Sequence, residues 1–311
     1  MAGTALRLDE VTKRYGEFTA VDRLSLEIPA GTIWGILGPN GAGKTTTLRM
    51  VNDILAPDQG RIEVLDGLAP GRDAARRIGY LPEERGLYPK MRVAAALTFF
   101  GELRGLTGRE ARRRAGAWLD RLELARWARN KVQDLSKGMQ QKVQFAAALI
   151  HEPELLVLDE PWSGLDPINA EVLRTMVAEQ KAAGRSVIFS THGMEQAEQI
   201  CDGVTIIARG RKVLDGRLAA IRREASTGRR VALGFAGAPA AAAAEAVLAD
   251  AALVRDRRVR RDHLEVELAD GAGADALLAA LVAAGVGLRR FEVVEPSLHQ
   301  IFVDRVGQER A

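Results

Sequence analysis

The sequence predicts an α/β domain followed by a small α+β domain. Short apolar runs alternate with helical stretches through the first two-thirds of the 311 residues, and this alternation is typical of a mostly parallel sheet. From residue 229 the pattern changes to the order β-α-β-β-α-β, which is the order of ferredoxin-like domains. A shift in composition after Asp215 separates the two patterns. We therefore expect one domain over residues 1–215 and another over residues 216–311.

The first domain contains apolar runs that predict strands buried on both faces. These runs are Thr32–Leu37, Leu155–Leu158, Ser186–Ser190 and Val204–Ala208. A helix is expected over residues 169–183. Residues 92–130 are rich in helix formers, with leucines spaced among many charges, so we expect a helical insertion over about residues 92–150.

The second domain has a strand or helix pattern at each position of the ferredoxin-like order. The expected strands are Arg229–Gly237, Leu253–Arg260, His263–Leu268 and Val286–Val294. The expected helices are Pro239–Ala251, Ala274–Gly285 and Ser297–Val306, of which the last follows the final strand.

Composition excludes several classes of protein. Lys and Arg number 44 against 41 Asp and Glu, so the net charge is +3. Because the second domain carries only +1 of it, no basic arm exists and we expect no nucleic-acid partner. A single cysteine, Cys201, allows neither an internal disulfide nor a cysteine metal cluster. No signal peptide and no membrane-spanning run is recognisable, so we expect a cytoplasmic protein.

A glycine-rich loop follows the first apolar run and precedes a helical pattern that opens at Thr46. Its residues match the phosphate-loop pattern G-x-x-x-x-G-K-[ST]: Gly38, Pro39, Asn40, Gly41, Ala42, Gly43, Lys44 and Thr45. Glycines let backbone N–H groups turn toward phosphate oxygens, Lys44 reaches the β- and γ-phosphates, and the Thr45 hydroxyl binds Mg²⁺. An ordinary glycine-rich turn is the alternative, which the flanking strand and helix disfavour.

Two consecutive acids end the strand pattern at residues 155–158. The carboxyl end of a strand in an open α/β sheet is where ligands bind, so Asp159 is predicted to hold Mg²⁺. Glu160 would then polarise the attacking water as general base. The alternative is an acid pair that only caps the strand.

Further motifs resemble those of one family, the ABC ATPases. Leu135–Gln141 (LSKGMQQ) is similar to the family's signature motif, Ser163–Asp166 (SGLD) to its D-loop, and Ser190-Thr191-His192 to its switch histidine. Tyr15 stands where the family places an adenine-stacking aromatic residue. The resemblance covers residues 6 to about 215 and implies a P-loop NTPase cassette with a helical subdomain.

The resemblance also implies how ATP is bound. Ser136, Gly138 and Gln140 of the signature, together with Asp166, would contact the ATP of another subunit, since the family sandwiches ATP between two chains. A helix N-terminus at Ser136 would provide an anion site. One chain has one cassette, so a second ATPase subunit is required, and a second copy of this chain would suffice.

For three residues, the sequence allows a structural role as an alternative to a role in ATP binding or hydrolysis. His192 is expected to contact the γ-phosphate and to orient Glu160, although a lone histidine after a strand is often structural. Tyr15 could instead be a half-buried strand residue. Glu83 stands where the family usually has Gln; we expect it near Mg²⁺, which accepts carboxylate oxygens, and a solvent-facing side chain is the alternative.

The resemblance is strongest to cassettes of exporters. The stretch Pro82–Pro89 (PEERGLYP), the signature and the tail at residues 295–302 resemble drug-resistance (daunorubicin-type) and sodium-efflux ATPases. This implies an integral membrane permease as partner, docking near residues 83–90 and the helical insertion, and a position at the inner face of the cell membrane. The alternatives are a non-transport ABC ATPase that acts on ribosomes or DNA, and a binding module without hydrolysis.

Overall fold

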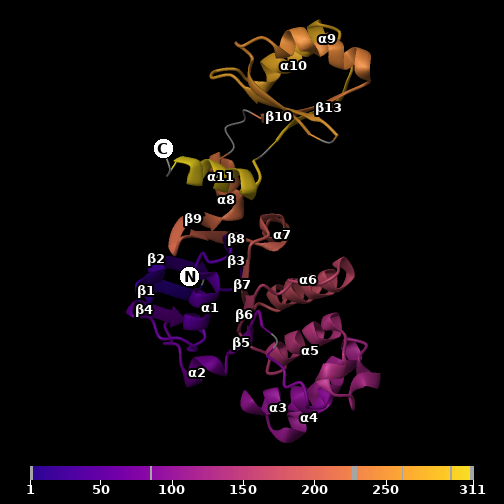
Figure 1. Cartoon of the computed structure of the whole chain (residues 1–311). Helices are drawn as coiled ribbons and strands as arrows, with labels where there is room; N and C mark the ends of the chain where they lie inside the picture. The colour runs from indigo at the N-terminus through magenta and orange to yellow at the C-terminus, as the bar shows by residue number, and fades with distance from the viewer. Residues whose placement is uncertain (1–2, 85, 226–229, 261, 295, 309–311) are drawn as a thin grey trace. The chain divides into compact units, whose positions relative to one another are not determined.

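Figure 1 shows the computed structural model of the chain, which describes residues 3–84, 86–225, 230–260, 262–294 and 296–308, with the backbone alone from residue 304. The chain divides into two compact units, Met1–Leu218 and Ala219–Ala311. The domain boundary expected after Asp215 falls within β9 (Arg211–Arg217), the last strand of the first unit.

A six-stranded sheet organises the first unit. Its order is β5-β6-β7-β3-β8-β9, and its pairs are parallel except for β8 with β9. The strands other than β9 are β3 (Ile33–Leu37), β5 (Ile78–Leu81), β6 (Leu155–Asp159), β7 (Ser186–Thr191) and β8 (Gly203–Ala208). Every residue of β3, β6 and β7 is buried, which explains their continuous apolar sequences. The α/β prediction is confirmed.

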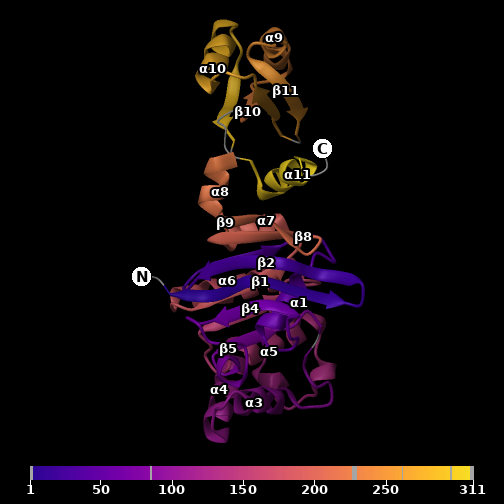
Figure 2. The same ribbon diagram turned by 90° about the vertical axis from the view of Figure 1, so that its left-hand side faces the viewer.

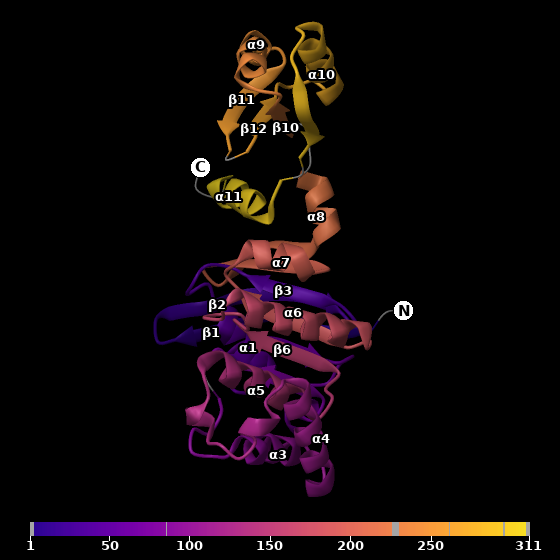
Figure 3. The same cartoon turned by 90° about the vertical axis from the view of Figure 1, so that its right-hand side faces the viewer.

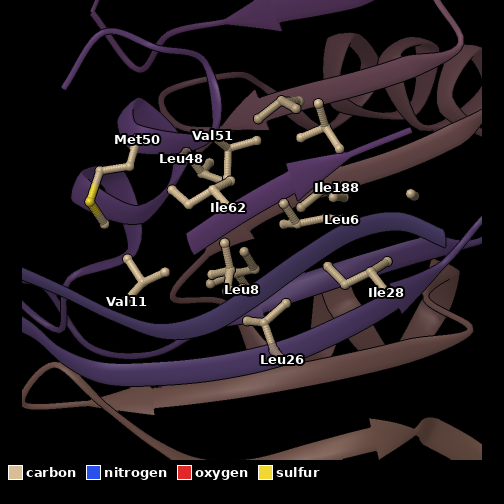
Figure 4. Packing of buried hydrophobic residues seen from close by; sticks show 14 of the residues in the cluster. Leu6, Leu8, Val11, Leu26, Ile28, Leu48, Met50, Val51, Ile62 and Ile188 are labelled. Atoms are coloured by element: carbon tan, nitrogen blue, oxygen red, sulfur yellow. The ribbon is translucent and has the colours of Figure 1, made fainter. Parts of the chain in front are cut away.

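A second, antiparallel sheet covers one face of the first. It consists of β1 (Thr4–Tyr15), β2 (Phe18–Pro29) and β4 (Gln59–Val64) in the order β2-β1-β4. Figure 2 shows this layer in front of the larger sheet. Apolar side chains of both sheets and of α1 (Lys44–Val51) form one core, of which Figure 4 shows Leu6, Leu26, Met50 and Ile188 among others. The apolar runs of the sequence do not predict this sheet.

Helices cover the opposite face of the large sheet, and a further set of helices forms the expected insertion. Figure 3 shows α6 (Pro167–Ala182) and α7 (Met194–Ile200) in front of the strands. The insertion contains α3 (Val93–Leu103), α4 (Gly108–Arg121), two short 3₁₀ turns and α5 (Lys137–Leu149). A short helix α2 (Arg72–Ala75) precedes β5. No helix in the described ranges is long and apolar enough to cross a bilayer.

The second unit has the ferredoxin-like arrangement. Its core elements are β10 (Arg230–Phe235), α9 (Ala238–Leu248), β11 (Val254–Val259), β12 (Leu264–Leu268), α10 (Ala274–Ala283) and β13 (Leu288–Val293). The sheet order β11-β12-β10-β13, with antiparallel pairs throughout, is the one that this order of elements produces. Inward-facing residues of the strands and of both helices form a separate apolar core.

Two helices flank this arrangement. The first, α8 (Leu218–Ala225), leads into the second unit and was not predicted, whereas α11 (Leu298–Gln308) corresponds to the expected final helix. Arg229, where the first strand of this domain was expected to begin, and Glu295, where the tail motif begins, lie outside the described residues.

Candidate active site

The candidate site lies where neighbouring parallel strands end. In the register of the sheet, Leu37 of β3 is opposite Thr191 of β7, and Ser190 of β7 is opposite Asp159 of β6. The glycine-rich loop, the two acids and His192 therefore leave the sheet at the same edge. This is the position at which open α/β sheets bind ligands.

The glycine-rich loop has a backbone that only glycine adopts readily. Gly38, Gly41 and Gly43 have φ values of 155°, 78° and 105°. A Cβ atom on Gly38 would lie 2.1 Å from the carbonyl oxygen of Ile207, and one on Gly43 would lie 2.4 Å from that of Ala20. The loop is thus pressed against neighbouring backbone, and Gly43 directly precedes α1. Its N–H groups stand at a helix N-terminus, which favours anions.

Lys44 is buried and lies across the loop. Its Nζ atom donates hydrogen bonds to the carbonyl oxygens of Gly38 (2.8 Å) and Pro39 (3.2 Å). The same atom is 3.6 Å from Oε1 of Glu160. The cation therefore stands between the phosphate loop and the acids that end β6.

The two acids have different surroundings. Asp159 is 1% exposed; its Oδ1 atom accepts hydrogen bonds from Thr45 Oγ1 (3.1 Å) and Ser190 Oγ (2.5 Å). Its Oδ2 atom is buried and has no hydrogen-bond partner among the described residues. Burial raises the pKa of Asp159, and the hydrogen bonds from Ser190 and Thr45 oppose that rise.

Glu160 faces the Lys44 ammonium and the His192 ring instead. It is 9% exposed, and its Oε1 atom lies 3.1 Å from Nδ1 of His192 as well as near the Lys44 ammonium. Its backbone has φ 45°, in the left-handed region. The His192 side chain is 61% exposed, so it is free to contact a ligand as well as Glu160.

A cleft of about 350 Å³ opens beside these residues. It is lined by the loop residues Asn40 to Thr46, by Glu83 and Glu160, and by Tyr15, Phe18 and Ala20. Tyr15 and Phe18 are opposite each other at the tip of the β1–β2 hairpin and are 48% and 62% exposed. Sequence reasoning missed Phe18. The available signal was Gly16 between two strand-like runs, which predicts a hairpin that brings Tyr15 and Phe18 together.

The four signature and D-loop residues are placed elsewhere. Ser136 is the N-cap of α5 and accepts a hydrogen bond from the N–H of Met139 (3.3 Å), and Asp166 caps α6 in the same way. Gly138 lies against Asn169, and Gln140 donates to the carbonyl oxygen of Leu135 (2.9 Å). Within the described part of the chain, none of the four lines the cleft.

A phosphate loop between strand and helix, with acids at the neighbouring strand end, defines a P-loop nucleotide-binding ATPase. The family described as ABC transporter matches residues 21–163, and the family described as ATP-binding protein DrrA1-3-like, C-terminal domain, matches residues 216–306. The chain belongs to the ATP-binding proteins of ABC transporters and is an ATPase of that family.

Curated relatives cover the chain from end to end. The ABC transporter ATP-binding protein YhaQ of Bacillus subtilis is 40% identical over 302 residues, which are 97% of this chain and 98% of that protein. The daunorubicin resistance ATP-binding protein DrrA3 of Streptomyces coeruleorubidus is 36% identical over 100% of this chain and 98% of its own length. The match to DrrA3 therefore includes the second unit.

Solved structures match the first unit. An ATP-binding subunit of an ABC transporter has a TM-score of 0.65 and 31% identity, over 71% of this chain and 93% of that one. A dimeric ATP-binding cassette in a post-hydrolysis state, bound to ADP and Pi, has a TM-score of 0.63 and 26% identity, over 68% of this chain and 98% of that one.

Proposed function

We propose that this chain hydrolyses ATP to drive export through a separate membrane permease. The observation that carries the proposal is the single cleft in which the glycine-rich loop, Lys44 and Glu160 meet, with Asp159 and His192 in hydrogen-bond contact with its residues. These are the groups that phosphoryl transfer to water needs: phosphate donors, a cation, a carboxylate beside the metal and a general base.

In this proposal, the loop residues 38–46 hold the triphosphate. Backbone N–H groups and the N-terminus of α1 bind phosphate oxygens, and Lys44 exchanges its contacts with the loop carbonyls for the β- and γ-phosphates. The base stacks on Tyr15, with Phe18 beside it, because both rings are exposed at the rim of the same cleft.

Magnesium would be held by Thr45 and Asp159. The Asp159 Oδ2 atom is buried and has no partner in the described part of the chain, and Thr45 contacts the other oxygen of the same carboxylate; this supports a hard cation at this point. Mg²⁺ at nucleotide sites is usually bound by one or two protein carboxylates together with phosphate oxygens. Glu83, in the cleft lining, would also approach this metal.

Hydrolysis would depend on Glu160 as general base. Its carboxylate is held between Lys44 and His192, so it points to the region where the γ-phosphate would lie. His192 would orient Glu160 and contact the γ-phosphate with its other ring nitrogen. The bound Mg²⁺ would neutralise phosphate charge during the transfer.

A second subunit would complete the site. Ser136, Gly138, Gln140 and Asp166 are at or near helix N-termini but outside the cleft of their own chain, which supports their action on the ATP of a partner. A second copy of this chain would supply them. ATP would then close the dimer, and hydrolysis would release it.

Relatives named for daunorubicin resistance and Nod factor export support an exporter that acts at the inner face of the membrane. An aromatic group formed by Tyr88, Phe99 and Phe100, with Tyr88 52% exposed, follows Glu83 and provides an apolar surface for the permease. Residue 85 of the expected docking stretch lies outside the described residues.

The substitution Glu160→Gln tests the hydrolytic part. Loss of the general base should slow hydrolysis about 10²- to 10⁴-fold and should leave an ATP-bound dimer that size-exclusion chromatography detects. The control is Glu154→Gln, which changes the same side chain just before the opposite end of β6, where it pairs with Arg77. A Glu160→Gln protein that stays monomeric at saturating Mg-ATP would contradict the sandwich.

The partner is tested by affinity purification from detergent-solubilised membranes. Export predicts that a permease co-purifies with the Glu160→Gln protein in the presence of ATP. Recovery of ribosomes or DNA without a permease would instead favour the non-transport alternative.

A further inference from the structure

One buried hydroxyl contacts both acids of the candidate site. Ser190, at the carboxyl end of β7, is 0% exposed. Its Oγ atom donates a hydrogen bond to Asp159 Oδ1 at 2.5 Å and accepts one from the backbone N–H of Glu160 at 3.0 Å. A serine hydroxyl can make both contacts at once because it is donor and acceptor.

The first contact decides which oxygen of Asp159 stays available. Oδ1 accepts from Ser190 and from Thr45, whereas the buried Oδ2 has no partner among the described residues. When Thr45 turns to a metal ion, Ser190 remains as a donor to Oδ1. Rotation of the carboxylate would break that bond, so Oδ2 would remain the oxygen that is left for a metal ion.

The second contact stabilises the turn that carries Glu160. A φ of 45° is unfavourable for a residue with a Cβ, and it persists only where the surroundings enforce it. The N–H of Glu160 is bound by Ser190 at this turn. The turn directs the Glu160 side chain away from the strand, toward Lys44 and His192.

We propose that Ser190 is a positioning residue for both carboxylates: it sets the oxygen that Asp159 offers to Mg²⁺ and the backbone turn that presents Glu160. The inference rests on the proposed function, since it needs a metal–nucleotide complex at this site. Because its Oγ atom is engaged by Asp159 and by the N–H of Glu160, Ser190 would itself contact neither the metal nor the nucleotide.

The chain offers a matched control in the same strand. Ser186, at the other end of β7, is also buried, and its Oγ atom accepts a hydrogen bond from the N–H of Gly31 at 2.9 Å. Ser186→Ala and Ser190→Ala therefore remove the same atom from the same strand. Only Ser190→Ala removes hydrogen bonds to Asp159 and Glu160.

The experiment measures Mn²⁺ affinity by electron paramagnetic resonance, in the presence of a non-hydrolysable ATP analogue. Ser190→Ala should bind Mn²⁺ about 10- to 100-fold more weakly than the wild type, as expected for loss of a partner of a metal ligand. Its kcat should fall as well, while its affinity for the analogue in EDTA should stay unchanged. Ser186→Ala should match the wild type in all three measurements.

A Mn²⁺ affinity of Ser190→Ala equal to that of Ser186→Ala would overturn the inference, whatever happens to kcat. If the wild type bound the analogue but no Mn²⁺, the proposed metal site would fail, and the inference with it. Should Ser190→Ala not fold, Ser190→Cys replaces it, because the thiol fills the site but is only a weak donor and acceptor.

Discussion

Two adjacent acids differ in chemistry because their backbones and neighbours differ. Asp159 is the last residue of a buried strand, and its carboxylate meets hydroxyl groups. Glu160 follows in the left-handed region, and its carboxylate meets Lys44 and His192. The different surroundings of the two neighbouring carboxylates thus accompany one change of φ between them.

A prediction at this scale concerns Tyr15. Tyr15→Ala should weaken ATP binding roughly 5- to 150-fold, because stacking of a base on an aromatic ring contributes about 1–3 kcal/mol. Binding of inorganic triphosphate should not change. Isothermal titration of both ligands measures the difference, and Tyr88→Ala, a similarly exposed tyrosine outside the cleft, is the control. Equal losses for ATP and triphosphate would argue against stacking.

At the scale of elements, α5 connects the signature to the sheet. Its first residue follows the Ser136 cap, and its last turns pack on β5 so closely that a Cβ on Gly79 would lie 2.2 Å from the carbonyl oxygen of Ala148. Just beyond the helix, the ring of His151 contacts the carbonyl oxygen of Ile78 through Nε2 at 3.1 Å. The helix is thereby anchored at its C-terminal end, and its N-terminus is exposed.

His151 makes this anchor sensitive to pH. Burial lowers the pKa of His151 from 6.5 to about 4, and Arg104 contributes in the same direction. The unfolded chain takes up a proton near pH 6.5, whereas the folded chain does so only near pH 4. The contribution to stability is therefore complete above about pH 6.5 and is lost as the pH falls toward 4, by up to about 1.4 kcal/mol per pH unit.

Urea unfolding at pH 7.5 and pH 5 checks this prediction. His151→Gln should reduce the difference in unfolding free energy between the two pH values. His299→Gln, at an exposed histidine of α11, should leave the difference as in the wild type. The explanation fails if both variants keep the same difference.

At the scale of the whole molecule, the cleft and the signature residues do not meet within one chain. The cleft is lined by residues 40–46 of the phosphate loop and by Glu160, and the N-terminus of α5 lies outside this lining among the described residues. Such a pair of surfaces suits a symmetric dimer in which each half serves the other chain.

Ser136→Arg tests the dimer. The long cationic side chain at the N-terminus of α5 should block closure of the ATP-bound dimer. ATP binding to the monomer should therefore change less than about twofold, while hydrolysis falls at least about tenfold. Thr107→Arg is the matched control, because Thr107 caps α4 with the same kind of bond, to the N–H of Glu110. Full ATPase activity of Ser136→Arg would rule out a site shared between chains.

Much of this architecture was predictable from local patterns. The apolar runs became β3, β6, β7 and β8, and the order of elements in the second domain produced the expected sheet. The antiparallel sheet escaped prediction because register shifts interrupt the alternation in β1, where Glu10 adopts φ 48°. Phe18 was missed with it, since its place in the cleft depends on that hairpin. The roles of the site residues stay predictions.

The sequence by itself determined the phosphate loop, the acids after β6 and the signature, because each is a contiguous motif whose chemistry follows from its residue types and spacing. Only the tertiary structure decided which atoms of those residues are available. Thr45 and Asp159 are 114 positions apart, and Ser190 is 31 positions beyond Asp159. Parallel strands bring their carboxyl ends to one edge regardless of that separation. The hydrogen bonds that occupy Asp159 Oδ1, and leave Oδ2 without a partner among the described residues, therefore arise from sheet order.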